Sequence, residues 1–235
     1  VAATAPELAI ADCRISGATL YGRLTTATGQ ATLDGPLRAA SAQCPERSLA
    51  LGRSSTVIRA TASPTFDRFD GQARLALGRI AAGGATVSTL GGTADFAWTG
   101  QGLDLRYDLA GRGVSLAEAR LESLALDGAL RARGEFERIT ADGSVRGRNL
   151  SPGPELDQSL GRMADSAAGT LAGPLLQQVR GGLRRELPGS TISGDFDVRS
   201  DSDGTSVTIP AAMLRGATGA ALVSLSRVQV RMGQG

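Results

Sequence analysis

Apolar and polar residues alternate along most of the first 150 positions. Within residues 103–109, three leucines and Tyr107 alternate with three charged residues. This period of two is typical of a β-strand with one apolar and one solvated face. The same alternation occurs in residues 56–63, 72–78, 93–98, 119–126 and 129–136. These segments predict an antiparallel meander of short strands.

Glycine-containing pairs punctuate these segments, and such pairs are the usual signal of tight turns. We predict turns at Asp34-Gly35, Asp70-Gly71, Gly83-Gly84, Gly91-Gly92, Asp127-Gly128 and Asp142-Gly143.

A helical pattern follows at residues 151–187. Its apolar residues recur at steps of three and four: Leu156, Leu160, Met163, Ala167, Leu171, Leu175, Val179 and Leu183. Pro154 suits the first turn, and Pro188 ends the pattern. Pro174, after Gly173, predicts a kink or a division into two helices. We expect this segment to lie on the sheet as a core helix. The alternative is a membrane-surface helix, which the mixed Asp, Gln and Arg residues of its polar face do not favour.

Strand patterns resume at residues 190–200, 205–210 and 221–232. The chain is therefore mainly β, and we expect three parts. Residues 1–150 form an antiparallel meander, residues 151–188 a helical segment, and residues 189–235 the closing strands of the same domain. The apolar face is poor in aromatic rings. It either packs on itself as a sandwich or barrel, which composition alone favours, or stays open as a groove.

Composition excludes several classes of enzyme. The chain contains no histidine and no lysine, and aromatic residues make up 3%. Catalytic pairs that need histidine, imidazole metal sites, Schiff bases and Walker lysines are therefore excluded. A net charge of +2 gives no strong attraction to nucleic acid.

The remaining candidate chemistry is weak. Asp104 with Asp108, and Glu135 with Glu137, could form carboxylate pairs, but each lies on the polar side of a strand. Residues 201–204 resemble a cation-binding loop but fit a hairpin turn better. We expect no catalytic residue, no metal and no cofactor.

The two cysteines, Cys13 and Cys44, have no metal-type spacing. In an oxidising compartment they would form a disulfide; otherwise they are two small buried thiols.

The N-terminal residues lack the features of a signal peptide, and no segment reaches the roughly 18 apolar residues that cross a bilayer. The chain begins at Val1, and we interpret it as a piece of a longer protein.

Residues 102–138, with their repeated short strands, resemble the AsmA-like and TamB-like proteins of Gram-negative envelopes. The order of elements is similar to that of the YdbH-type branch. A helical segment containing residues 169–176 is followed by strands at 194–198, 207–210 and 220–229. The resemblance covers most of the chain. It rests on the spacing of the repeated strand patterns and on the order of the elements.

This resemblance implies a long curved antiparallel sheet that forms a groove (a β-taco) with one kinked helix or helical hairpin. It also implies a non-enzymatic periplasmic module of a bridge-like phospholipid transporter, whose parent chain is anchored in the inner membrane. The expected partners are phospholipid acyl chains, the remainder of the parent chain and other envelope proteins. The residues expected to line the groove are Leu75, Leu77, Val87, Phe96, Trp98, Leu103, Leu105, Tyr107, Leu109, Val114, Leu116, Leu121, Leu124, Leu126, Phe136, Phe196, Val198, Val207 and Ile209. The alternatives are a structural or adhesive β-domain with a packed interior, and a carbohydrate-active β-helix enzyme.

Overall fold

A computed structural model describes residues 1–10, 12–27, 29–134 and 137–233. The strands are β1 (Ala2–Ile10), β2 (Cys13–Tyr21), β3 (Arg23–Ala27), β4 (Gln30–Ala39), β5 (Ser41–Cys44), β6 (Leu49–Leu51), β7 (Ser54–Ala62), β8 (Arg68–Leu77), β9 (Ile80–Ala82), β10 (Ala85–Thr99), β11 (Gly102–Ser115), β12 (Ala119–Arg133), β13 (Arg138–Pro152), β14 (Thr191–Asp201), β15 (Gly204–Arg215) and β16 (Ala221–Met232). A short 3-10 helix spans Pro45–Arg47, and the α-helices are α1 (Pro154–Ser166) and α2 (Ala172–Glu186).

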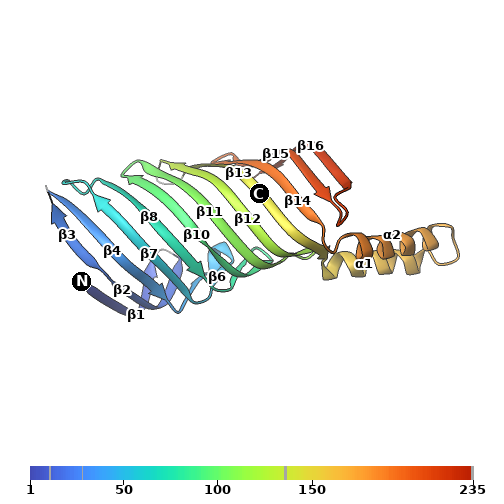
Figure 1. Cartoon of the computed structure of the whole chain (residues 1–235), viewed down its shortest axis with the longest axis horizontal. Helices are drawn as coiled ribbons and strands as arrows, with labels where there is room; N and C mark the ends of the chain where they lie inside the picture. The colour runs from blue at the N-terminus through green and yellow to red at the C-terminus, as the bar shows by residue number, and fades with distance from the viewer. Residues whose placement is uncertain (11, 28, 135–136, 234–235) are drawn as a thin grey trace.

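All of these strands belong to one antiparallel sheet with the connectivity of a meander. From β10 to β16 each strand pairs with the next along the chain (Figure 1). In the N-terminal half, some bent strands are each divided into two short strands. For example, β6 and β7 pair with β9 and β8 respectively, across the same junction. The predicted antiparallel meander is confirmed.

A line of bends crosses the strands. At Gly52 and Gly78 the backbone turns while two hydrogen bonds are kept, from Gly52 N to the Arg79 oxygen and from Gly78 N to the Arg53 oxygen, each 2.7 Å. In the longer strands the bend is a local irregularity. Ser88 faces Gly113, whose φ is +62°, and donates a hydrogen bond of 3.3 Å to its carbonyl oxygen. These irregularities act like bulges, which bend a sheet and sharpen its twist.

The bend shifts the alternation of side chains by one residue. Along β11, the residues on the concave face are two positions apart from Leu103 to Gly111. The next concave residue is Val114, three positions after Gly111. The same step separates Leu124 from Leu121 in β12. Without this shift, a strand with period two would turn its apolar side chains to the opposite face beyond the bend. The shift therefore keeps one continuous apolar face.

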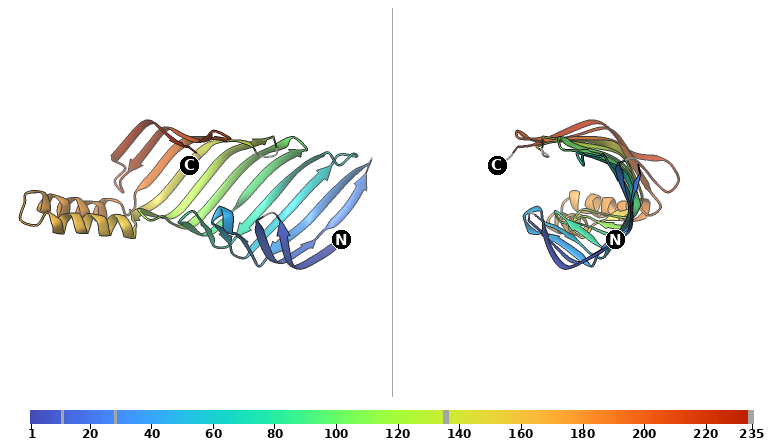
Figure 2. Two further views of the ribbon diagram at one scale, coloured as in Figure 1. Left: turned by 180° about the vertical axis from the view of Figure 1, so that it is seen from behind. Right: turned by 90° about the vertical axis from the view of Figure 1, so that its left-hand side faces the viewer.

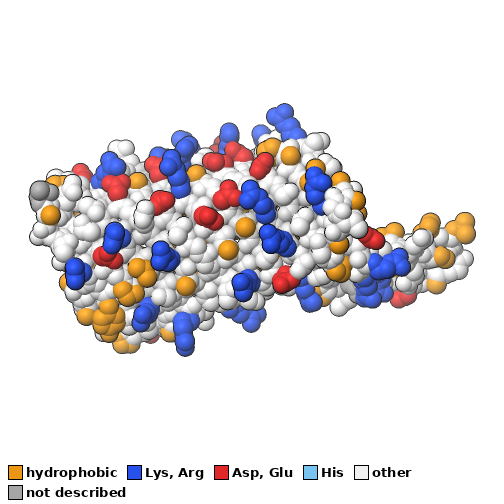
Figure 3. Space-filling view, in the orientation of Figure 1, with side chains coloured by type: hydrophobic (Ala, Val, Ile, Leu, Met, Phe, Trp, Pro, Cys, Tyr) orange, Lys and Arg blue, Asp and Glu red, His pale blue; other side chains and the backbone are white. Residues whose placement is uncertain are grey.

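The sheet curves into a C-shaped cross-section (Figure 2). Charged side chains are spread over the outer, convex face, with a group of apolar side chains at the lower left of the view (Figure 3). Most large apolar residues of β8 and β10–β15 face the concave side. The predicted fold class, a mainly β chain with a long curved antiparallel sheet that forms a groove and a helical hairpin, is confirmed.

Five of the six predicted glycine turns are wrong. Gly83-Gly84 is a turn, but Asp34-Gly35, Asp70-Gly71, Gly91-Gly92, Asp127-Gly128 and Asp142-Gly143 lie inside strands β4, β8, β10, β12 and β13. The glycine of each Asp-Gly pair faces the concave side, where a neighbouring strand leaves little room for a side chain. Spatial crowding, rather than a turn, accounts for these glycines.

The helical segment is divided into two helices that form a hairpin, which is one of the two forms predicted. The chain reverses at residues 167–171, where Gly169 has a φ of +88°, and Pro174 lies in the first turn of α2. The expectation that the helix lies on the sheet is wrong. The helices pack on each other, α2 contacts the sheet at β13, and the hairpin projects past β16 (Figure 1).

Candidate functional site: the concave face of the sheet

The two faces of the sheet differ in chemistry. In β11, Leu103, Leu105 and Leu109 are half-buried on the concave side, whereas Asp104 and Arg106 are exposed on the convex side. An antiparallel sheet with one apolar and one wet face follows directly from this alternation.

Cross-strand register aligns the concave residues in continuous apolar rows. Phe96 faces Leu105, and Leu105 faces Leu130 on the next strand. That row then continues through Ala141, Val198, Val207 and Val230. A parallel row passes through Leu75, Gly92, Leu109, Leu126 and Val145. The rows run across the strands from one end of the sheet toward the other.

Nearly all of the predicted lining residues that the structure describes lie on the concave side of the strands. Leu116 lies in the turn that follows β11, and Phe136 lies outside the described residues. The sequence analysis missed further residues of the same face, including Ile58, Leu90, Leu130, Val145 and Ile192. Continuing the two-residue alternation through the neighbouring strands would have found them.

The concave face is not filled by the protein's own side chains. Among the residues described, the buried apolar side chains are Cys44, Ala62, Ala94, Val114, Ala132, Ala164 and Leu187, most of them small. Larger concave residues are open to solvent: Leu24 is 52% and Leu225 is 47% exposed. A β-sandwich would bury such residues under a second sheet.

Total exposed area supports the same conclusion. The structure exposes 14999 Å², whereas a compact folded chain of 24.0 kDa exposes about 9,900 Å² by the usual scaling with mass. The excess is expected of a single-layer sheet whose inner face stays uncovered. A packed interior, which the structural-domain alternative requires, is absent from the part of the chain that the structure describes.

Three aromatic rings lie flat against the concave face. Phe96 pairs with Gly71, Tyr107 with Gly128 and Phe196 with Gly143. A Cβ atom at the glycine would lie 2.7 Å from Phe96 Cζ, 2.8 Å from Tyr107 Oη and 3.1 Å from Phe196 Cζ respectively. Each ring therefore occupies the space above a glycine on the adjacent strand, a pairing known to stabilise glycine in sheets. Laid down in this way, the rings leave the space above the sheet open.

The position of the Tyr107 ring on the concave face affects the pKa of its hydroxyl. Burial raises the pKa of its hydroxyl above the ordinary value, and the negative charges of Asp142 and Asp127 act in the same direction. Both effects disfavour the phenolate. Tyr107 thus contributes a neutral surface at ordinary pH.

Two further features of the concave face lie near its edges. Phe69 and Trp98 pack with ring centroids 5.4 Å apart, near one end of β8 and β10. Cys13 and Cys44 form a disulfide between β2 and β5, with Cα atoms 4.1 Å apart. Cys44 is buried on the concave side, next in register to Leu49.

On the convex face, several carboxylates are paired with arginines. Arg133 donates two hydrogen bonds to Asp104, at 2.8 and 2.9 Å, and Arg59 binds Asp34 at 2.6 Å. Asp104, one half of a predicted carboxylate pair, is therefore an ion-pair acceptor; Glu135 lies outside the described residues. Exposed pairs of this kind contribute about 0–1 kcal/mol each.

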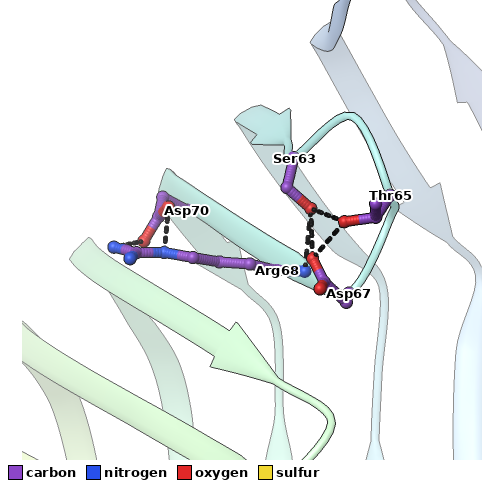
Figure 4. Close-up of polar contacts among 5 residues, drawn as sticks. All are labelled: Ser63, Thr65, Asp67, Arg68 and Asp70. Carbon is purple, nitrogen blue, oxygen red and sulfur yellow. Dashed lines mark hydrogen bonds and ion pairs between the residues drawn. The ribbon is translucent and has the colours of Figure 1, made fainter.

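The turn between β7 and β8 illustrates this polar surface (Figure 4). Ser63 and Thr65 donate hydrogen bonds to Asp67 Oδ1, at 2.6 and 2.8 Å, and these bonds lower the pKa of Asp67. Arg68 pairs with Asp70 at 2.7 Å. The cluster closes a turn, and the lowered pKa makes the Asp67 carboxylate a weaker base toward the two hydroxyls that it accepts hydrogen bonds from.

A polar hollow of about 1020 Å³ lies on the same face near β14–β16. Asp197, Arg199, Thr208, Gln229 and Arg231 are among the residues that line it. Among the residues described, no group of acidic or cysteine side chains could hold a metal ion.

These features define a class: a single-layer, curved antiparallel sheet with an apolar concave face and a charged convex face. The model of the YdbH-like family, described as intermembrane phospholipid transport protein YdbH, matches residues 2–234. The chain therefore belongs to the YdbH-like family, which is a family of lipid transport proteins of the cell envelope and not an enzyme family. No curated protein and no solved structure gives a significant match to the chain.

Within the described ranges, neither α1 nor α2 has the length and apolarity required to cross a membrane.

Proposed function

We propose that the concave face binds the acyl chains of phospholipids and forms part of the path along which a YdbH-like protein carries them between membranes. The observation that supports this proposal is an apolar face that the protein's own atoms leave half-exposed, from Leu24 at one end of the sheet to Leu225 near the other. Membership of a phospholipid transport family supports the choice of ligand.

The energetics suit a hydrocarbon guest without a polar anchor. Each buried methylene contributes roughly 0.8 kcal/mol, so a chain that buries about a dozen methylenes gains on the order of 10 kcal/mol before the cost of ordering it. The head group stays in water at the open side of the C. Because the rows are continuous, the chain moves from one set of leucines to the next without crossing a polar barrier, and transfer is passive.

The same proposal places the protein in the periplasm, as part of a parent chain anchored in the inner membrane. The Cys13–Cys44 disulfide supports this location, since disulfides persist in oxidising compartments. The parent chain and other envelope proteins are the partners that would extend the groove.

Leu105→Asp and Leu77→Asp test the lining directly. Each places a carboxylate in an apolar row, where its desolvation disfavours a hydrocarbon neighbour. We expect either variant to lose most of the phospholipid that co-purifies with the wild-type chain, as measured by lipid extraction and mass spectrometry. Circular dichroism should still show a folded sheet.

The matched control is Ala110→Asp, which adds the same charge to the same strand as Leu105 but on the convex face, where Ala110 is exposed. This variant should retain normal lipid. If the Leu105 and Leu77 variants retain as much lipid as the control does, the lining assignment is wrong.

A further inference from the structure

Four of the chain's eight aromatic residues lie at one end of β8 and β10. Phe69 and Trp98 pack on the concave face with ring centroids 5.4 Å apart. Phe96 is the concave residue next to Trp98 along β10, and Phe66 is 60% exposed in the turn that precedes β8. The following strands carry aliphatic residues at the level of Trp98: Leu103, Ala132 and Ile139. The rings are therefore concentrated at one place along the groove.

This place is a boundary between polar and apolar surface. Trp98 is the last residue but one of β10 and is followed by the polar turn at residues 99–101. Phe69 is the second residue of β8 and follows the hydroxyl–carboxylate turn shown in Figure 4. Both turns belong to one free edge of the C-shaped section (Figures 1 and 2). In membrane proteins, aromatic rings gather at the corresponding level, between the hydrocarbon and the head groups.

Trp98 carries a hydrogen-bond donor that the protein leaves unused. Its side chain is half-buried, and among the described residues none accepts a hydrogen bond from its Nε1 atom. That atom is nevertheless not shielded from solvent. Its neighbours in the concave row, Phe69 and Leu103, have no acceptor in their side chains. A purely hydrocarbon guest at this level would bury the donor unpaired, which costs free energy, whereas a guest with an acceptor here would not.

The length of the strands shows where the rest of such a guest fits. The concave residues of β10 run from Trp98 to Leu90, near the bend, over eight residues. This is about 26 Å at the usual rise of a strand. The acyl chains of one leaflet occupy about 15 Å, half of a hydrocarbon core of about 30 Å. Acyl chains that begin at Trp98 and run along the strands therefore end before the bend, with their whole length on the apolar face.

We propose that the Trp98 indole N–H donates a hydrogen bond to an ester carbonyl oxygen of a phospholipid whose acyl chains run along the strands from this edge toward the bend. The head group then lies in water beyond the edge, and Phe69 holds the indole ring from the side. This inference rests on the function proposed above. It narrows the ligand to ester-linked phospholipids and gives them one orientation in the groove.

A pair of lipids that differ only in their linkage tests the hydrogen bond. Trp98→Phe keeps an aromatic ring but has no donor. We expect it to bind ester-linked phosphatidylethanolamine about threefold to tenfold more weakly than the wild type, the range expected of one hydrogen bond. The ether-linked analogue has no carbonyl oxygen and should bind both proteins equally. Affinities are measured on delipidated protein by competition against a phospholipid with a fluorescent acyl chain.

Phe96→Leu is the matched control, because it removes aromatic surface from the same strand without removing a donor. It should change the affinity for the ester-linked and ether-linked lipids by the same factor. Unchanged binding of the ester-linked lipid by Trp98→Phe, or an equal loss of both lipids, would overturn the proposal. An equal loss would show that the indole only packs against the guest.

The orientation of the acyl chains is tested with tryptophan at two depths. Leu109 lies six residues beyond Leu103 along β11, about 20 Å from the level of Trp98. It pairs with Gly92, over which a larger ring has room to lie. At saturating ester-linked lipid, bromine near the ester should quench Trp98 more strongly than bromine near the methyl end. The order should reverse in the Trp98→Phe, Leu109→Trp variant.

The outcomes of this experiment separate the orientation from the groove itself. Stronger quenching of Trp98 by bromine near the methyl end, or equal quenching by both lipids, would overturn the orientation and leave the groove intact. If bound brominated lipid quenches neither tryptophan, the acyl chains lie elsewhere, and the proposed function fails together with this inference.

Discussion

At the scale of single residues, glycine decides where the aromatic rings of the concave face lie. Tyr107 lies over Gly128 because that position has no side chain, and the next glycine across the sheet, Gly143, receives Phe196 in the same way. Larger residues at these positions would lift the rings away from the sheet. The glycines thus keep the apolar surface smooth.

Gly128→Ala tests the account that the adjacent strand and the Tyr107 ring together leave no room for a side chain at this position. Its Cβ would lie 2.8 Å from Tyr107 Oη and closer still to the Asp142 carbonyl oxygen. We expect overpacking of this kind to lower the free energy of unfolding by about 1–3 kcal/mol, as measured by denaturant titration. Gly100→Ala is the control, since nothing lies within 4 Å of its Cβ position. Equal stability of the two variants would contradict the account.

The same glycines show why residue-level prediction failed in part. An Asp-Gly pair is among the strongest sequence signals for a turn. Nothing in the sequence around Asp127-Gly128 indicates that this pair lies inside a strand instead. The backbone of the adjacent strand at Asp142 and the ring of Tyr107, some twenty residues earlier in the chain, together explain the glycine. Contacts between strands are not encoded in the local pattern.

At the scale of elements, the bends make the difference between a flat sheet and a curved one. The sequence does contain a trace of them, since the apolar residues Leu121 and Leu124 are three apart in an otherwise alternating strand. Asn149, facing Glu122 across the same bend, has a φ of +54° and donates a side-chain hydrogen bond to that glutamate. Asparagine is among the few residues that adopt this conformation readily.

The disulfide joins two paired strands on the same side of a bend, β2 and β5, across 31 residues of sequence. Closing such a loop stabilises a fold by about 3–4 kcal/mol in the chain-entropy model. We expect reductant to lower the unfolding midpoint of the wild-type chain in guanidinium. The Cys13→Ala, Cys44→Ala double variant should already have the lower midpoint and should not respond to reductant. A wild-type midpoint that reductant leaves unchanged would contradict this role.

The helical hairpin shows what periodicity can and cannot predict. Steps of three and four correctly predicted a helical segment, and Gly173-Pro174 indicated that it is not one straight helix. The same apolar stripe suits a helix packed on a sheet and a helix exposed on a stalk. The pattern could therefore not show that Leu171 and Leu175 would lie so exposed.

At the scale of the whole molecule, the single layer is the feature on which function depends. The leucines that line the concave face would serve equally well as the interior of a sandwich, and composition favoured that alternative. Curvature excludes it, because a C-shaped sheet turns its apolar face toward a space that no other element of the described chain enters. Most of the lining could be predicted from alternation along the strands, whereas the opening depends on how the whole sheet curves.

Trp98 provides the most direct test of the claim that hydrocarbon occupies this space. It is the single tryptophan of the chain and lies on the concave face, paired with Leu103. Phospholipids brominated in their acyl chains should quench its fluorescence when added to delipidated protein, whereas the unbrominated lipids should not, and Leu105→Asp should abolish the quenching. Unquenched Trp98 emission in the presence of bound brominated phospholipid would contradict the account, because the acyl chains would then lie somewhere other than the concave face.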